Sequence, residues 1–424
     1  MSAPPTLATD DLSEVYIDLH AHPELSFHET RTAGIVAQRL AALGYDVTAG
    51  VGGTGVVAIL DNGPGPTVLL RADMDGLPVL EATGLEYAST ARGVDPAGKD
   101  VPVMHACGHD MHVACLLGAA AELVRTRDQY EGRLMLVFQP AEELGAGAKA
   151  MVEDGLFERF GQPDVVLGQH VAPLPAGMIG LRAGLAFAAS DSLTITLHGR
   201  GAHGSRPEAS VDPVVMAAAT IMRLQTIVSR ETAGTETAVV TIGCVHAGTK
   251  DNIIPDDAEL RLNVRTVDPR VRERTLAAIT RIATAEAEAS GAPRPAEVIH
   301  TDHFPAVVND DDAVSRTREA FVSWLGPGRV IDPGVVTGSE DVGLLATAAD
   351  VPCVFWLLGG ADPAPFAAAT TGQQLLEVVR AVPSNHSPQY APVITPTLAN
   401  GVTALVTAAR AWLPGTSTSR IRHM

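Results

Sequence analysis

Hydrophobic and polar positions follow two different periods in the first part of the chain. Apolar residues at Ile35, Val36 and Leu40 keep helical spacing, which predicts a helix over Glu29–Leu43. The same kind of pattern predicts further helices over His109–Arg125 and Ala146–Glu153, and strands at Tyr45–Val47, Val56–Leu60, Thr67–Arg71, Arg133–Phe138 and Asp164–Leu167. Strands that alternate with helices in this way are typical of an α/β sheet covered on both faces.

After about residue 183 the pattern changes to that of a sheet with one solvated face. Leu193, Ile195 and Leu197 alternate with polar residues, which predicts a strand exposed on one side. Strands at Thr237–Gly243 and Glu259–Val267 and helices over Pro213–Val228 and Val271–Ala289 complete this layer, while a strand at Pro352–Leu358 and a helix over Thr397–Trp412 resume the first pattern. We therefore expect a mixed α/β domain of residues 1–183 and 303–424, interrupted by an inserted α+β domain with an open-faced sheet at residues 184–302. The last ten residues, GTSTSRIRHM, are expected to form a loose tail.

Composition and charge narrow the class of protein. The 424 residues are 46% hydrophobic and 19% charged, which is typical of a globular protein with a large core. A formal net charge of -19 argues against nucleic acid or an anionic membrane as a partner, because both need a basic surface. No apolar run is long enough to span a membrane, and the first residues lack the pattern of a secretory signal. With only four cysteines in so long a chain, we expect a cytoplasmic protein without a disulfide framework.

The densest group of chemically active residues is Met104–His112. Cys107 and His109 lie two residues apart at the start of a predicted helix, and a thiolate next to an imidazole suits a borderline-soft ion such as zinc. By itself such a pair is more often part of a core, because an isolated cysteine usually behaves as a small buried hydrophobe.

Further polar residues follow the predicted strands, where ligand sites of α/β sheets form. Arg71, Asp73 and Asp75 follow one strand with period 2, so their side chains are expected to point the same way. These carboxylates would orient or bridge metal ligands, although a solvated turn explains them equally well. The adjacent pair Glu142 and Glu143 follows the next strand. We expect these two side chains to face different directions, one as a metal ligand and one as a base for metal-bound water.

Two histidines complete the set of candidate ligands. His170 is expected at the end of a strand and His386 in a loop near the C-terminus, and either residue alone would be interpreted as a core or loop histidine. Together, five candidate ligands fall at predicted strand ends or in adjoining loops of the α/β part, which predicts a metal site made by Cys107, His109, Glu143, His170 and His386.

With these motifs in place, the chain resembles the M20 peptidase and amidohydrolase family. The resemblance is to the branch of hippurate hydrolases, auxin-conjugate hydrolases and bacterial N-acyl-amino-acid amidohydrolases. The matching segments run in family order across nearly the whole chain: His22-Pro-Glu-Leu-Ser-Phe27, Arg71-Ala-Asp-Met-Asp-Gly-Leu-Pro78, His105-Ala-Cys-Gly-His-Asp110, Gln139-Pro-Ala-Glu-Glu143, His203-Gly-Ser-Arg-Pro207, Asn252-Ile-Ile-Pro255, Gly338-Ser-Glu-Asp341 and Asn385-His386.

This resemblance implies a role for each matching residue. The five ligands would hold two divalent metal ions in each subunit, with Glu142 as the general base. Asp73, Asp75 and Asp341 would contact and orient the metal ligands without binding the ions themselves. The inserted domain would be a lid that also forms a homodimer. His203 would then reach the scissile carbonyl group from the partner subunit. Asn252 and Arg265 would receive the carboxylate of an N-acyl amino acid.

The implied reaction is amide hydrolysis by a metal-activated water, with zinc favoured by the thiolate and manganese or cobalt as possible substitutes. A metallo-carboxypeptidase or dipeptidase of the same family and a non-catalytic metal-binding protein are the alternatives. A dinucleotide-binding enzyme is a poorer match, because the glycine-rich string Gly50–Gly55 precedes a strand-like segment and is interpreted as a hairpin turn. A serine hydrolase is also a poorer match, since no G-x-S-x-G sequence occurs.

Overall fold

The computed structural model describes residues 9–416, which form two compact units. The second unit consists of Phe187–Val307 and Val335–Glu340, and the remaining described residues form the first unit. The boundaries expected from the sequence place Val335–Glu340 in the first domain, whereas in the structure these residues belong to the second unit. The predicted loose C-terminal tail lies outside the described residues from position 417 onward.

The first unit is built on a mixed eight-stranded sheet. Its four central strands β6, β3, β7 and β18 are parallel, and antiparallel strands continue the sheet on both sides. In spatial order the strands are β1 (Asp46–Val51), β2 (Gly55–Asn62), β6 (Gly132–Gln139), β3 (Thr67–Asp73), β7 (Val165–Pro175), β18 (Cys353–Ala361), β8 (Ile179–Gly180) and β17 (Val330–Ile331). The parallel centre aligns the carboxyl ends of its strands at one edge, where sites of α/β folds form.

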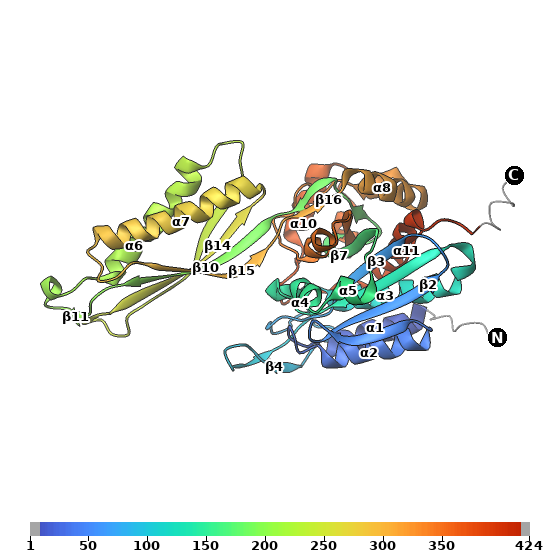
Figure 1. Cartoon of the computed structure of the whole chain (residues 1–424), viewed down its shortest axis with the longest axis horizontal. Helices are drawn as coiled ribbons and strands as arrows, with labels where there is room; N and C mark the ends of the chain where they lie inside the picture. The colour runs from blue at the N-terminus through green and yellow to red at the C-terminus, as the bar shows by residue number, and fades with distance from the viewer. Residues whose placement is uncertain (1–8, 417–424) are drawn as a thin grey trace. The chain divides into compact units, whose positions relative to one another are not determined.

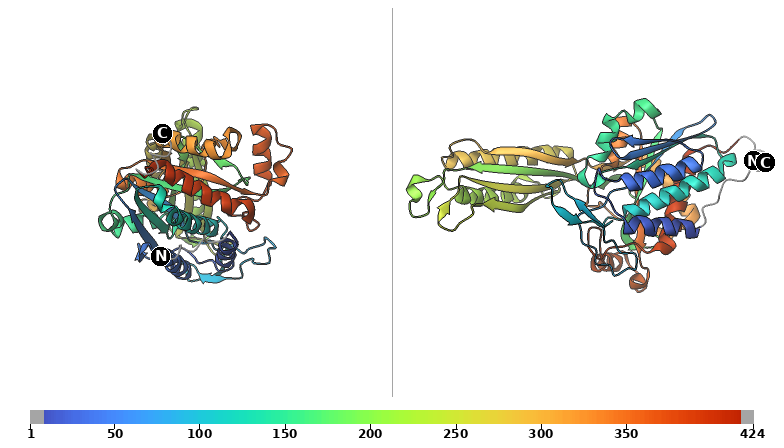
Figure 2. Two further views of the ribbon diagram at one scale, coloured as in Figure 1. Left: turned by 90° about the vertical axis from the view of Figure 1, so that its right-hand side faces the viewer. Right: turned by 90° about the horizontal axis from the view of Figure 1, so that it is seen from below.

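Helices cover both faces of this sheet (Figure 1). On β3, Val68 and Leu70 join the large core beneath α3 and α11, whereas Leu69 points to the opposite face and is equally buried. The first face is covered by α1 (Thr9–Ala21), α2 (Thr30–Ala42), α3 (His109–Arg125), α8 (Asp311–Leu325) and α11 (Ile394–Trp412), and Figure 2 shows α1 and α3 side by side. The other face is covered by α4 (Gly147–Glu153), α5 (Leu156–Phe160) and α9 (Val342–Ala349). Burial on both faces explains why the central strands are almost entirely apolar.

The remaining elements of the first unit are short or peripheral. They are the ribbon of β4 (Arg92–Val94) and β5 (Asp100–Pro102) and the helix α10 (Gly372–Ala381), while the paired segments β9 (Gly184–Phe187) and β16 (Val307–Asn309) contain the boundary residues of both units. None of the helices found between residues 9 and 416 has both the length and the apolar character needed to cross a membrane.

The glycine-rich string Gly50–Gly55 is a hairpin turn, as predicted. It joins β1 to β2, which pair antiparallel with Val51 opposite Gly55. No helix follows this turn, because β2 runs on to Asn62. The string therefore lacks the helix N-terminus that a dinucleotide site requires.

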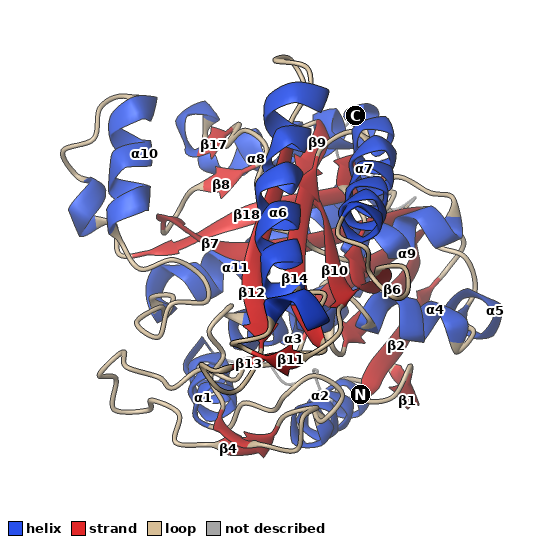
Figure 3. Cartoon of the chain, turned by 90° about the vertical axis from the view of Figure 1, so that its left-hand side faces the viewer, coloured by secondary structure: helices blue, strands red, loops and turns tan. Residues whose placement is uncertain are grey.

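The second unit is an antiparallel sheet with helices on one face only (Figure 3). The strand order is β12 (Ala238–Ala247), β14 (Asp257–Thr266), β10 (Ala189–His198) and β15 (Glu297–Phe304). Leu193, Ile195 and Leu197 of β10 pack into a core with α6 (Pro213–Thr226) and α7 (Pro269–Ala289). A small ribbon of β11 (Ala202–His203) and β13 (Ile253–Ile254) completes the unit. The open-faced sheet predicted from the alternating pattern is confirmed.

Candidate metal centre

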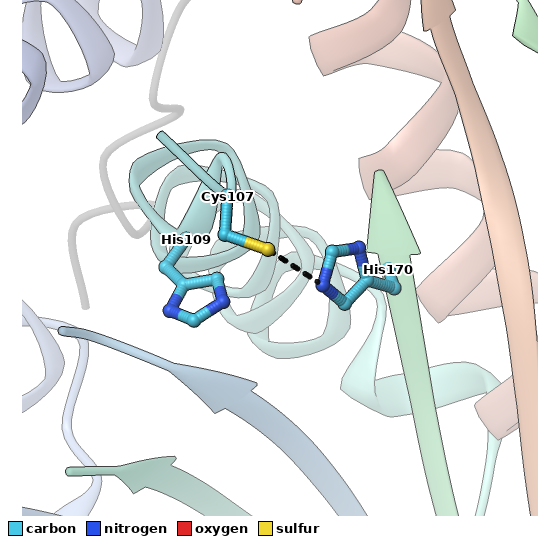
Figure 4. A group of neighbouring side chains, drawn as sticks. All are labelled: Cys107, His109 and His170. Atoms are coloured by element: carbon cyan, nitrogen blue, oxygen red, sulfur yellow. Dashed lines mark hydrogen bonds between the residues drawn. The ribbon is translucent and has the colours of Figure 1, made fainter. Parts of the chain in front are cut away.

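The five predicted metal ligands lie together at the carboxyl edge of the first unit's sheet. Cys107 lies two residues before the start of α3, His109 is the first residue of that helix, and His170 comes from β7 (Figure 4). The Cys107 Sγ atom lies 3.4 Å from His170 Nε2, and His386 Nε2 lies 3.4 Å from Glu143 Oε2. Side chains separated by up to 279 positions in the sequence thus share one small volume (386 − 107 = 279).

Among the described residues, five groups of three side chains have ligand atoms within 4.8 Å of one another, and three of the five contain at least two of the predicted ligands. These three groups are Cys107 with His109 and His170, Cys107 with Glu143 and His386, and His109 with Glu142 and Glu143. Cys107 belongs to the first two groups, so its sulfur lies close to both sets of donor atoms. The donor atoms are sulfur, imidazole nitrogen and carboxylate oxygen, the combination that zinc accepts.

Gly108 makes the approach of Cys107 and His109 possible. Its φ of +83° is in the left-handed region that glycine adopts without strain, and the turn leads directly into α3. A Cβ atom at this position would lie 2.5 Å from the side chain of Val171, next to His170. A glycine between the two ligands therefore allows both the turn and the close contact with β7.

His170 does not lie at a strand end, which corrects the sequence-based prediction. Strand β7 runs on to Pro175 because it keeps pairing with β18 beyond this point. Its other neighbour, β3, stops pairing at the contact of Arg71 with Gly168. His170 is thus in the interior of its own strand but beyond the paired part of β3, which leaves its ring free to face Cys107.

The expectation that Glu142 and Glu143 face different directions is also wrong. Both residues lie in a single 3-10 turn, Glu142–Leu144, that follows β6. His109 Nε2 is 3.9 Å from Glu142 Oε2 and 3.8 Å from Glu143 Oε1. The tight turn brings both carboxylates close to His109 Nε2. The turn begins at Ala141, which has a φ of +47°. A non-glycine residue in this region is strained and needs support from its surroundings.

Asp75 provides much of that support. One of its oxygens accepts hydrogen bonds from the Ser26 hydroxyl at 2.7 Å and the Glu143 amide at 3.0 Å. The other oxygen accepts from the Glu142 amide at 3.2 Å and lies 3.2 Å from His109 Nδ1. This buried carboxylate therefore fixes the glutamate turn and the orientation of the His109 ring together.

On the other side of the cluster, Arg71 links the carboxylates of Asp73 and Asp341. The Arg71 guanidinium donates to Asp73 at 2.6 Å and to Asp341 at 3.2 Å, so Arg71 and Asp73 lie on the same side of β3, as predicted. Asp341 also accepts from the Gln139 amide at 2.7 Å. Burial alone would raise the pKa of Asp73, but the charges of Arg71 and the neighbouring histidines hold it well below its usual range.

His112, to which the sequence analysis gave no role, connects two parts of the cluster. Its Nδ1 atom is hydrogen-bonded to Asp73, and its Nε2 atom accepts from the Val171 amide at 2.7 Å. The residue lies one turn after His109 on α3, so the helical spacing was the available signal. His112 thereby fixes β7 next to His170.

The electrostatics of the cluster favour a bound cation. Burial would lower the pKa of His109, but Asp73 and Asp75 outweigh it and raise that pKa to about 10. Burial, followed by the charges of Glu143 and Glu142, raises the pKa of the Cys107 thiol. Among the described residues, the buried atoms His109 Nε2 and Glu143 Oε1 have no hydrogen-bond partner. A metal ion would satisfy both atoms and offset the negative charge, so the donor set fits such an ion.

In the second unit, the other predicted site residues lie in two separate places. His203 and Asn252 are neighbours, because β11 pairs with β13 and the Gly204 amide donates to the Asn252 carbonyl at 2.8 Å. Arg265 lies toward the opposite end of β14, where it donates to the Thr337 carbonyl at 2.9 Å and to the Ser339 hydroxyl at 2.7 Å. The eight residue-to-residue steps from Asp257, beside the His203 ribbon, to Arg265 span ~26 Å at about 3.3 Å each. Asn252 and Arg265 of one chain therefore cannot bind the same carboxylate.

Comparison with known proteins identifies the family. The model of peptidase family M20/M25/M40 matches residues 69–379. The chain belongs to this family. It is 42% identical to hippurate hydrolase of Campylobacter jejuni over 74% of this chain and 79% of that protein. It is 37% identical to thermostable carboxypeptidase 2 of Saccharolobus solfataricus over 82% of this chain and 86% of that protein. The crystal structure of a dinuclear metal-binding M20 peptidase from Bacillus subtilis superposes with a TM-score of 0.72 at 29% identity, covering 95% of this chain and 98% of that one.

Proposed function

We propose that this protein is a metal-dependent amidohydrolase that cleaves the amide bond of N-acyl amino acids. The observation that carries the proposal is the set of sulfur, nitrogen and oxygen donors gathered around the buried Cys107, with a second glutamate beside it. The similarity to hippurate hydrolase supports the substrate class, because hippurate is itself an N-acylated amino acid. The similarity to a dinuclear M20 peptidase supports two ions in each subunit.

The groups of the cluster suggest how two ions would be held. Cys107 with His109 and His170 would hold one ion, and Cys107 or its neighbours Glu143 and His386 would hold the other. We propose Zn²⁺ as the native ion because of the thiolate, with Mn²⁺ or Co²⁺ as functional substitutes. When bound, such ions lower the pKa of a water molecule and polarise the amide carbonyl group.

Glu142 is the proposed general base. Its carboxylate is buried within the cluster, yet the group of Cys107, Glu143 and His386 is complete without it. Glu142 would accept the proton of the attacking water and deliver it to the departing amine.

Arg265 is proposed to bind the free carboxylate of the substrate. Burial alone lowers its pKa, and no carboxylate lies within 4.0 Å of its guanidinium among the described residues. It lines a cavity of about 480 Å³ in the second unit with Thr237, Val239, Thr241 and Asn263. A half-buried guanidinium without an acidic partner is suited to a carboxylate ligand.

The ~26 Å span of β14 supports a homodimer. We propose that two copies associate through the second unit, so that His203 and Asn252 of one subunit act with Arg265 and Glu142 of the other, and His203 stabilises the developing oxyanion. Strand β12 is an edge of its sheet, and exposed apolar side chains line it and the neighbouring helix α6: Val239, Val245, Val214, Val215 and Met222. Exposed apolar residues on an edge strand and an adjacent helix are suited to contact with a second copy.

The first experiment combines elemental analysis with an activity panel. The purified protein is expected to contain two divalent ions per chain and to release amino acids from N-acetyl and N-benzoyl derivatives. Glu142→Gln should lower kcat by roughly 10²–10⁴-fold, the usual contribution of general acid–base catalysis, while the metal content stays the same. Loss of metal in this variant would mean that Glu142 is a ligand rather than the base. A wild-type protein without metal and without amidase activity would refute the proposed function.

A carboxypeptidase is the second candidate, because of the similarity to thermostable carboxypeptidase 2. A peptide is also an acylated amino acid with a free carboxylate, so the same residues would bind it. Peptides and N-benzoyl amino acids that end in the same residue are compared at equal concentration. A higher kcat/KM for the peptides would favour the carboxypeptidase.

Mixed dimers test whether His203 acts across the interface. His203→Ala and Glu142→Gln are each expected to be nearly inactive as homodimers. In a heterodimer, one site combines intact Glu142 from one chain with intact His203 from the other, while the second site carries both defects. Activity should therefore return to about half of the wild-type value per heterodimer. Heterodimers that are confirmed by mass spectrometry but show no recovery would refute this arrangement.

A further inference from the structure

The side-chain amide of Asn385 lies between the segments that carry three of the candidate ligands. Its Nδ2 atom donates to the Cys107 carbonyl at 3.0 Å and to the Val171 carbonyl at 3.1 Å, and it lies 3.8 Å from the Cys107 sulfur. Val171 directly follows His170 on β7, and His386 directly follows Asn385. One amide group thus contacts the backbone at or beside Cys107, His170 and His386.

The loop that carries His386 needs such an anchor. His386 has a φ of +70°, a left-handed conformation that is unfavourable for a non-glycine residue. Its side chain is 56% exposed, so little burial offsets this cost. The same stretch is also held by the hydrogen bond of the His386 amide to the Ala106 carbonyl at 2.8 Å and by that of the Ala82 amide to the Pro388 carbonyl at 2.7 Å. The direction of the His386 ring toward Glu143 therefore depends on how firmly its neighbour is held.

We propose that Asn385 is a positioning residue for the metal centre, which uses its two N–H donors to hold His386 against Cys107 and β7 and keeps its amide in contact with the Cys107 sulfur. Asparagine suits this task because its amide offers two N–H donors without a charge. An aspartate of the same shape would have no donor and would place a negative charge beside the thiolate. Because the inference rests on the proposed metal site, its test must first establish metal binding by the wild-type protein.

The experiment compares Asn385→Ala and Asn385→Asp with the control Asn309→Ala in the full chain. Asn309 is buried in the first unit, whereas Asn385 is only partly buried, but the Asn309 amide likewise bridges two backbone carbonyls, those of Arg182 at 2.9 Å and Phe355 at 2.8 Å. Affinity for Zn²⁺ is measured by competition with a chelator. The absorption spectrum of the Co²⁺-loaded protein is also recorded, because its sulfur-to-cobalt charge-transfer band reports on the thiolate.

Both Asn385 variants are expected to bind Zn²⁺ about 10–100-fold more weakly, the usual effect of removing a partner of a metal ligand. The charge-transfer band should shift in both, and more strongly with aspartate. Asn309→Ala should lower the Tm without changing the affinity or the band. Unchanged affinity and spectrum in the Asn385 variants would overturn the inference, and so would loss of the fold in both, which would make Asn385 a residue of general stability. A wild-type protein that binds no metal would instead refute the proposed function.

Discussion

His20 provides the strongest prediction about stability. The imidazole is fully buried in the first unit, where its Nδ1 atom lies 2.6 Å from Asp110 and its Nε2 atom lies 3.0 Å from Glu81. The ring joins α1 to the start of α3 and to the loop that contains Glu81. Replacing His20 with glutamine removes the positive charge between the two carboxylates and keeps a side chain of similar size.

The size of the effect follows from the pKa of His20. Burial is the largest influence and lowers this pKa, but Asp110 and Glu81 outweigh it and raise it from 6.5 to about 10. Because the folded-state value is the higher one, the stabilisation is complete below pH 6.5 and is lost as the pH rises through 10. A rise from 6.5 to about 10, at about 1.4 kcal/mol for each pH unit, gives an upper limit of ~5 kcal/mol.

The assay is urea unfolding of metal-free wild type and His20→Gln at several pH values from 6 to 10. The difference in unfolding free energy should be largest near pH 6 and should shrink toward pH 10, by no more than about 1.4 kcal/mol per pH unit. His22→Gln serves as a control, because the His22 side chain is exposed and its variant should show no such trend. A difference for His20→Gln that stays constant over the whole range would refute the reasoning.

Three further predictions concern the sulfur atoms and the carboxylate site. Cys107→Ala should weaken metal binding, because the sulfur belongs to two ligand groups, and elemental analysis that finds two tightly retained ions would contradict its role as a ligand. Native protein should expose one fast-reacting thiol per chain to a disulfide reagent, because Cys244 is partly exposed. The other three cysteines, Cys107, Cys115 and Cys353, are buried. A Cys244→Ser protein that still reacts rapidly would disprove this assignment. Esterifying the substrate's carboxylate should chiefly raise KM, and equal kcat/KM for free and blocked substrates would exclude Arg265 as its ligand.

Much of the first unit could be predicted from local pattern. The predicted bounds of α3, His109–Arg125, agree with the structure, because a continuous run of helix-forming apolar residues follows the left-handed Gly108. The end of β7 could not be predicted, since the strand continues only where β18 pairs with it, and β18 comes from a segment almost 180 residues later (353 − 175 = 178). Helices α1, α8 and α10 and strand β15 were not predicted. In β15 most side chains are exposed, so the sequence shows little alternation.

The residues of the candidate site could likewise be predicted only in part. Residue chemistry and motif order were enough to select Cys107, His109 and His386, because their types alone suit a metal. The common direction of Glu142 and Glu143 was missed, since it depends on the strained turn at Ala141 and on the Asp75 carboxylate. The contacts of Asn385 were missed for a related reason, because its partners are backbone carbonyls and leave no trace in the pattern of side chains.

The position of β18 has a consequence for the order in which the chain folds during synthesis. This strand lies inside the sheet of the first unit, between β7 and β8, although it is made after residue 352. The four-stranded sheet of the second unit, in contrast, is complete once β15 ends at Phe304. A growing chain can therefore complete the sheet of the second unit first. Strand β7 lacks its neighbour β18 until that later segment has been made. His386 leaves the ribosome later still, so the full ligand set exists only after residue 386 has emerged, and chains truncated before this residue would fail to assemble it.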